Sequence, residues 1–125
     1  FFIDRADSKF NHYDISNKIE IKSILKKSGF DCIQLSKIDW YRQIYIFNNA
    51  KNIIASHGAG LANLVFCKKN TKVYEILIKS DSNRNMYQNI SEKIKLNYKK
   101  IIISNNNNNN KRNIELNIGI LNKYL

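Results

Sequence analysis

The most constraining feature of this chain is the run from residue 53 to residue 63. An apolar stretch ends in Ala55, Ser56 and His57, and Gly58 and Gly60 then precede a helix-forming segment. This order is typical of a buried strand that leads through a glycine-lined turn into the N-terminus of a helix. Such a turn leaves backbone N–H groups unpaired at the positive end of the helix dipole. The run therefore predicts an α/β fold with a turn that suits an anion, most often a phosphate.

Strands and helices alternate on both sides of this run. We expect helices at residues 18–28, after Asp39, at 61–66 and at 84–95, and strands at 1–4, 30–35, 52–56, 72–77 and 98–103. Five strands separated by helices predict a Rossmann-like, doubly wound parallel sheet with right-handed crossovers.

Local signals mark the ends of these elements. Asn17 and Asp39 are predicted N-caps, with Glu20 at the capping-box position of the first helix, and Gly29 fits the position just after that helix. Glu75 is the carboxylate of the strand at 72–77, and we expect it near the end of that strand. Carboxylates there accept ribose hydroxyls in nucleotide-binding sheets.

The length of 125 residues predicts one domain. We assign the domain to residues 1–104, a disordered asparagine-rich loop to 105–112, and a packing element to 113–125. The chain opens inside a predicted strand at Phe1, so we expect it to be part of a longer protein. It has no run of about 18 apolar residues, and no membrane span is predicted.

The formal net charge of +11 allows two interpretations. Basic chains often bind nucleic acid or an acidic polymer, which keeps a non-enzymatic binding module as an alternative. The lysines are scattered rather than clustered, so we favour a compositional origin and expect no nucleic-acid partner. Cys32 and Cys67 do not form a metal-binding spacing with His12 and His57, and we predict neither a metal nor a cofactor.

Several phosphate and acyl-transfer motifs are missing. The chain has no Gly-x-Ser-x-Gly, no Gly-x-Gly-x-x-Gly and no Walker A sequence. A nucleoside-diphosphate site fits better, because Gly58 and Gly60 let the backbone approach the phosphates closely. The competing interpretation is a plain tight turn with a surface histidine.

These residues also carry a resemblance. Arg5, Asn17, Gln43, the run from His57 to Asn63, and Glu75 are similar to the C-terminal catalytic region of glycosyltransferase family 61. The resemblance runs from residue 1 to about residue 98, and the block from 53 to 75 is its most specific part. Lys18 and Arg42 depart from the pattern, since the family usually has acidic residues after the asparagine and before the glutamine.

The resemblance implies a GT-B glycosyltransferase in which this chain is the donor-binding half. It implies transfer of a sugar from a nucleotide-sugar, with a UDP-sugar expected, to a hydroxyl of a glycan or protein. The N-terminal domain of the same enzyme would be its partner. Arg5 and His57 are the predicted catalytic residues, which neutralise the departing nucleoside diphosphate. The predicted donor contacts are Asn17, Gln43, Gly58, Ala59, Gly60, Asn63 and Glu75.

The resemblance further implies transfer without a metal ion, in agreement with the lack of an Asp-x-Asp motif. Polysaccharide biosynthesis and protein glycosylation are the implied processes. We expect a cytoplasmic location, or the secretory pathway and Golgi for a eukaryotic source. A catalytically degenerate copy is the remaining alternative.

Overall fold

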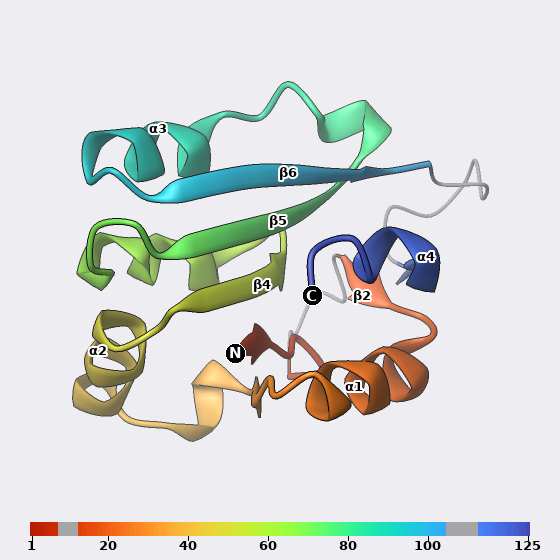
Figure 1. Ribbon diagram of the computed structural model, residues 1–125, viewed down its shortest axis with the longest axis horizontal. Coiled ribbons are helices and arrows are strands. Elements are labelled where there is room, and N and C mark those ends of the chain that lie inside the picture. The colour runs from red at the N-terminus through yellow and green to blue at the C-terminus, as the bar shows by residue number, and fades with distance from the viewer. Residues whose placement is uncertain (8–12, 105–112) are drawn as a thin grey trace.

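The computed structural model describes residues 1–7, 13–104 and 113–125 (Figure 1). The predicted asparagine-rich loop at 105–112 lies outside these residues. The strands are β1 (Phe2–Ile3), β2 (Asp14–Ile15), β3 (Cys32–Ile33), β4 (Asn52–Ser56), β5 (Lys72–Ile78), β6 (Asn97–Ile103) and β7 (Asn113–Ile114). The α-helices are α1 (Lys18–Lys27), α2 (Trp40–Asn48), α3 (Met86–Lys93) and α4 (Ile118–Leu121). Short 3₁₀ helices are η1 (Leu35–Lys37), η2 (Ala59–Phe66) and η3 (Lys79–Asp81).

The main sheet has five parallel strands in the order β3-β1-β4-β5-β6. The chain passes from β1 to β3 on one side and then crosses to β4 on the other side of β1. Counted within this sheet, the order is 2-1-3-4-5, a common doubly wound arrangement. The predicted Rossmann-like α/β fold is confirmed, and its switch point lies between β1 and β4.

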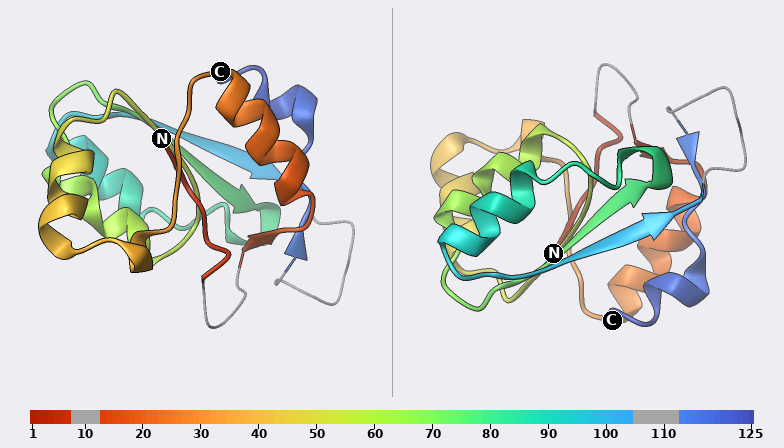
Figure 2. Two further views of the ribbon diagram at one scale, coloured as in Figure 1. Left: turned by 90° about the horizontal axis from the view of Figure 1, so that it is seen from below. Right: turned by 90° about the horizontal axis from the view of Figure 1, so that it is seen from above.

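Helices cover both faces of the sheet (Figure 2). Successive strand residues point to opposite faces, so Phe2 and Ile54 pack into one core while Ile3 and Ile53 pack into the other. The first core holds the apolar faces of α1 and α4, through Ile21, Leu25 and Leu121. The second holds those of α2, η2 and α3, through Phe47, Leu61, Leu64 and Tyr87.

Most predicted elements are confirmed, with shifted ends. The strand expected at 30–35 is reduced to β3 because the chain turns into η1 at Leu35, and the segment after Gly58 is 3₁₀ rather than α-helical. The small parallel sheet of β2 and β7 was not predicted, because two-residue strands are too short to show periodicity.

The predicted caps at Asp39 and Gly29 are confirmed, and the predicted capping bond from Asn17 is wrong. Asp39 caps α2 by accepting a hydrogen bond from the Arg42 N–H at 2.8 Å, and Gly29 has a positive φ of 81° after α1. Asn17 is at the N-cap position of α1, but its side chain makes no capping bond. Its amide instead donates to the Leu116 carbonyl at 3.0 Å and accepts from the Leu116 N–H at 3.1 Å.

The C-terminal residues share a core with the main sheet. Ile114, Leu116 and Leu121 are buried together with Phe2 and Ile54. None of the helices in the described parts of the chain has the length and apolar character needed to cross a membrane.

Candidate functional site

A cavity lies at the switch point of the sheet. It has a volume of about 200 Å³. Its lining residues come from the end of β1, from the end of β4 with the turn that follows, and from the start of η1: Ile3, Asp4, Arg5, Asp7, Ser56, Gly58, Ala59, Gly60, Leu61 and Leu35. Open α/β sheets bind ligands at this place because the loops on either side of the switch point run in opposite directions. Four predicted site residues meet here: Arg5, Gly58, Ala59 and Gly60.

Arg5 and Gly58 depend on each other. The Arg5 Nη1 group donates to the His57 carbonyl oxygen, and the guanidinium occupies the space that a Cβ at Gly58 would fill. Gly58 has an extended backbone, so the close approach of Arg5, rather than φ, is what requires glycine here. Burial lowers the pKa of Arg5 from its usual value, while Tyr87 and Asp7 act in the opposite direction. A half-buried cation therefore lies beside the glycine-lined turn.

The His57 ring lies outside the described lining of this cavity and pairs with Glu75. Its Nδ1 is hydrogen-bonded to the Glu75 Oε1, and the Tyr98 hydroxyl donates a hydrogen bond to the Glu75 Oε2. The predicted place of Glu75 near a strand end is wrong, because β5 continues for three residues beyond it. Glu75 lies opposite Ala55 of β4 and is 1% exposed. Its contact with a ribose stays a prediction.

Three further side chains surround the His57 ring. The rings of Tyr13 and Tyr87 both contact it, with ring centroids at 5.5 and 5.4 Å from the His57 centroid. The Arg84 Nη1 is 3.3 Å from the His57 Nε2. The sequence pattern gave no signal for Arg84, which precedes a helix like many exposed polar residues.

Asp81 connects this group to its surroundings. It accepts a hydrogen bond from the Tyr13 hydroxyl at 2.6 Å, and its other oxygen is 3.5 Å from the Arg84 Nε. Burial, followed by the bond to Asp81, raises the pKa of Tyr13. Burial, followed by the bond to Glu75, likewise raises the pKa of Tyr98. Both phenols therefore remain hydrogen-bond donors at neutral pH.

Gln43 and Asn63 hold the elements around the cavity together. The Asn63 amide donates to the Gln43 Oε1 at 2.8 Å, and the Gln43 Nε2 donates to the carbonyls of Leu35 at 2.9 Å and Ile38 at 3.2 Å. These bonds join α2 and η2 to the turn that carries Leu35. The donor contacts of Gln43 and Asn63 stay predictions.

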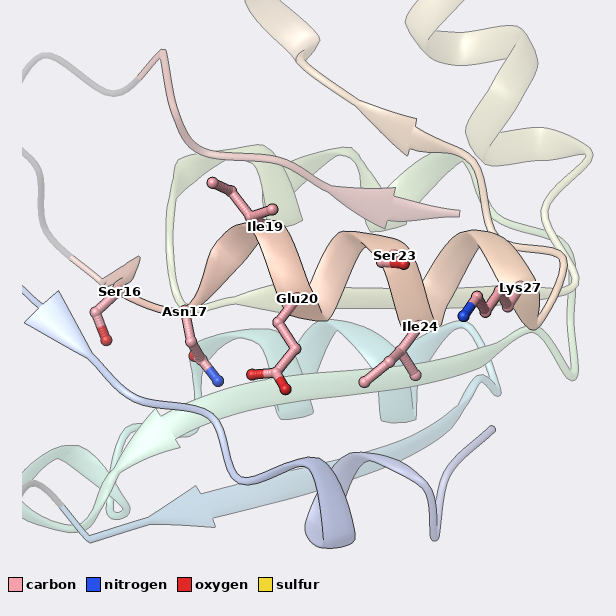
Figure 3. A pocket seen from close by; sticks show the side chains of 7 residues that line it. All are labelled: Ser16, Asn17, Ile19, Glu20, Ser23, Ile24 and Lys27. Atoms are coloured by element: carbon pink, nitrogen blue, oxygen red, sulfur yellow. The ribbon is translucent and has the colours of Figure 1, made fainter.

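Asn17 belongs to a different part of the surface. It lines a separate cavity of about 630 Å³ along α1, together with Ser16, Ile19, Glu20, Ser23, Ile24 and Lys27 (Figure 3). The two cavities share no lining residue. The structure thus does not bring Asn17 to the Gly58–Gly60 turn, and its predicted donor contact is untested.

Metal-ligating side chains are dispersed. In the part of the chain that the structure describes, no three His, Cys, Asp or Glu side chains gather in a way that could hold a metal ion.

Comparison with known families gives a match over the N-terminal part of the chain. The family model of glycosyltransferase 61 matches residues 1–74. This stretch includes Arg5, Asn17, Gln43 and the turn after His57, and it ends one residue before Glu75. It is shorter than the resemblance expected from the sequence, which runs to about residue 98. No curated protein matches the chain. Because the match covers more than half of its residues, the chain belongs to the glycosyltransferase 61 family.

Proposed function

We propose that this chain binds the nucleoside diphosphate of a nucleotide-sugar, a UDP-sugar in the first instance, for transfer of the sugar to a glycan or protein hydroxyl. The observation that carries the proposal is the cavity between β1 and β4, which is lined by Arg5 and the Gly58–Gly60 turn. Both lie within the residues that match the family. The position agrees with ligand binding at the switch point of doubly wound sheets.

The turn offers donors to a phosphate. The first hydrogen bond of η2 runs from the Leu61 N–H to the Gly58 carbonyl at 3.0 Å, so the N–H groups of Ala59 and Gly60 precede the bonded part of the helix. Hydrogen bonds to a charged group contribute about 1.5–3 kcal/mol each. The Arg5 guanidinium adds a cation to these backbone donors.

At the anomeric carbon, the transfer breaks one bond and forms another, and the acceptor hydroxyl gives up its proton to a base. The acceptor oxygen bonds to the anomeric carbon, the bond from that carbon to the diphosphate oxygen breaks, and the electron pair leaves with the nucleoside diphosphate. Arg5 and the turn would stabilise the charge that develops on the leaving group. In this proposal they take the place of a metal ion, in keeping with the lack of an Asp-x-Asp motif.

Ala59 offers a direct test because it is exposed and lines the cavity. An Ala59→Asp substitution places a negative charge beside the phosphates, and Ala59→Asn has the same shape without the charge. Calorimetric titration with UDP, GDP, CDP and ADP should show saturable binding of at least one nucleotide. We expect Ala59→Asp to weaken that binding at least about tenfold, or about 1.4 kcal/mol, and Ala59→Asn to weaken it far less.

Two results would count against the proposal. One is a cooperatively melting chain that binds no nucleoside diphosphate at millimolar concentrations. The other is an equal loss of affinity in both variants, since it would mean that the phosphates do not lie near Ala59. A melting-temperature scan gives an independent reading, because a ligand at 100 times its Kd stabilises the folded state by about 2.7 kcal/mol.

A further inference from the structure

The His57 ring has a defined hydrogen-bonding state in this structure. The Arg84 guanidinium can only donate, so the His57 Nε2, which is 3.3 Å from its Nη1, is the acceptor. A neutral imidazole with an acceptor at Nε2 carries its proton on Nδ1. That N–H group donates a hydrogen bond to the Glu75 carboxylate. The neighbours of the ring therefore favour the Nδ1–H tautomer.

Glu75 is placed to hold the ring rather than to meet a ligand. It is 1% exposed, and its two oxygens are taken by His57 and by the Tyr98 hydroxyl. Because Glu75 is this buried, a ribose hydroxyl could reach its carboxylate only if the neighbouring groups moved aside. A buried carboxylate is costly unless it is paired and hydrogen-bonded, and here the pairing is with a histidine.

We propose that Glu75 is a positioning residue, which keeps the proton of His57 on Nδ1 so that Nε2 can accept the proton of the acceptor hydroxyl. This inference rests on the proposed function. In the transfer step, the O–H bond of the acceptor breaks and its proton binds to Nε2, while the oxygen bonds to the anomeric carbon. His57 then becomes an imidazolium beside the Glu75 carboxylate, which stabilises the new charge.

Arg84 covers the Nε2 of His57. Its side chain is 52% exposed and is anchored through its Nε to Asp81 at 3.5 Å. A side chain this exposed can turn away from the ring and uncover the Nε2.

The charged and titratable groups around His57 come from several elements. Glu75 of β5 and Arg84 after η3 contact the ring nitrogens, and the rings of Tyr13 and Tyr87 contact the imidazole ring. Arg5 donates to the His57 carbonyl oxygen. Asp81 contacts Arg84, and Tyr98 donates to Glu75, so these two residues are linked to the ring only indirectly. Of these groups, Glu75 is the one whose removal takes the partner from Nδ1.

Nitrogen NMR of the imidazole tests the tautomer without any ligand. At neutral pH we expect the wild-type chain to show His57 mainly as the Nδ1–H form. In Glu75→Gln the two tautomers should mix, because an amide can donate as well as accept. Glu92→Gln, an equal change of charge at an exposed position of α3, should leave the wild-type pattern unchanged. An Nε2–H form in the wild type, or no change in Glu75→Gln, would overturn the inference.

Tyr98→Phe is a second variant, to be measured in case Glu75→Gln does not fold. It removes one bond to Glu75 but keeps the carboxylate, so the Nδ1–H form should persist. If Glu75→Gln does not fold, the tautomers of the wild type and of Tyr98→Phe decide the question.

A binding arm separates this inference from the alternative of ribose recognition. We would compare the Kd of UDP with that of 2′-deoxy-UDP in the wild type and in Glu75→Gln. A positioning role leaves the ratio of the two Kd values unchanged within about twofold. A ratio that falls to one in Glu75→Gln would assign the carboxylate to the ribose and overturn the inference. If UDP does not bind at all, the proposed function fails in this chain, and the tautomer still decides the role of Glu75.

Discussion

The two glycines of the turn, Gly58 and Gly60, differ in which neighbour a side chain at that position would meet. A Cβ at Gly58 would overlap the Arg5 guanidinium, while a Cβ at Gly60 would lie 2.8 Å from the Leu35 Cδ1, the end of a flexible side chain. Gly58 therefore leaves space for a charged group that also binds the His57 carbonyl, and Gly60 leaves space beside an apolar group that can shift.

We predict that Gly58→Ala lowers the free energy of unfolding by about 1.5–3 kcal/mol, because it forces Arg5 out of its hydrogen bond to His57. Gly60→Ala should cost less than about 1.5 kcal/mol, since only Leu35 has to adjust. Urea denaturation of both variants measures the difference. Equal losses would show that the close approach of Arg5 to Gly58 does not matter to folding.

Individual side chains show where sequence reasoning succeeds and where it fails. Arg5 and Gly58 were each predicted as site residues, and they come together because both follow parallel strands that end at the same edge of the sheet. Glu75 was misplaced because its depth in β5 depends on where the strand ends. Arg84 was missed because its approach to His57 depends on how η3 and α3 are placed, and no local pattern encodes this.

At the scale of elements, Asn17 joins two ends of the chain. It begins α1, and its amide makes both of its bonds to the backbone of Leu116, which is fully buried between β7 and α4. Buried backbone groups need a hydrogen-bond partner, so this one side chain secures the C-terminal segment against α1.

Asn17→Ala should lower the free energy of unfolding by about 1–3 kcal/mol, because it leaves buried polar groups of Leu116 without this partner. Asn89→Ala, at an exposed position of α3, should change it by less than about 0.5 kcal/mol. Chemical denaturation gives both values, and amide exchange should show faster exchange at Leu116 in the first variant only. A Kd for UDP that rises in Asn17→Ala, with stability unchanged, would support the predicted donor contact instead.

The elements that were predicted well are those with a clear periodic pattern. The strand bounds of β4 and the start of α1 match the predictions because apolar spacing and a run of polar residues mark them. The pairing of β2 with β7 joins residues about 100 positions apart, so it depends on the tertiary structure and leaves no local signal.

At the scale of the whole molecule, Asp4 links three elements at the edge of the cavity. It follows β1 and is 6% exposed, and its Oδ2 accepts bonds from Lys22 of α1 at 2.5 Å and from Gln34 after β3 at 2.8 Å. Burial by itself would raise the pKa of Asp4, but the bonds from Lys22, Gln34 and the Ala6 N–H outweigh it and lower the pKa.

This lowered pKa predicts a dependence of stability on pH. The stabilisation by Asp4 is present above the carboxyl pKa of the unfolded chain, about 3.9, and is lost as the pH falls through the lower pKa of the folded state. Asp4→Asn should therefore reduce stability at pH 7 and flatten the decline in acid. Denaturation from pH 7 to below pH 3 measures this, with the exposed Asp31→Asn as control. An acid decline that is as steep in Asp4→Asn as in the wild type would contradict the prediction.

The sequence by itself determined the fold class and the glycine-lined turn. Apolar periodicity and turn residues act within a few positions of the chain, and parallel strands bring their carboxyl ends together whatever the details. Only the tertiary structure decided that Glu75 pairs with His57, that Arg84 covers the free nitrogen of that ring, and that Asn17 secures the C-terminal segment. Each of these contacts depends on strand register or helix placement, where a shift of one residue changes the face on which a side chain lies.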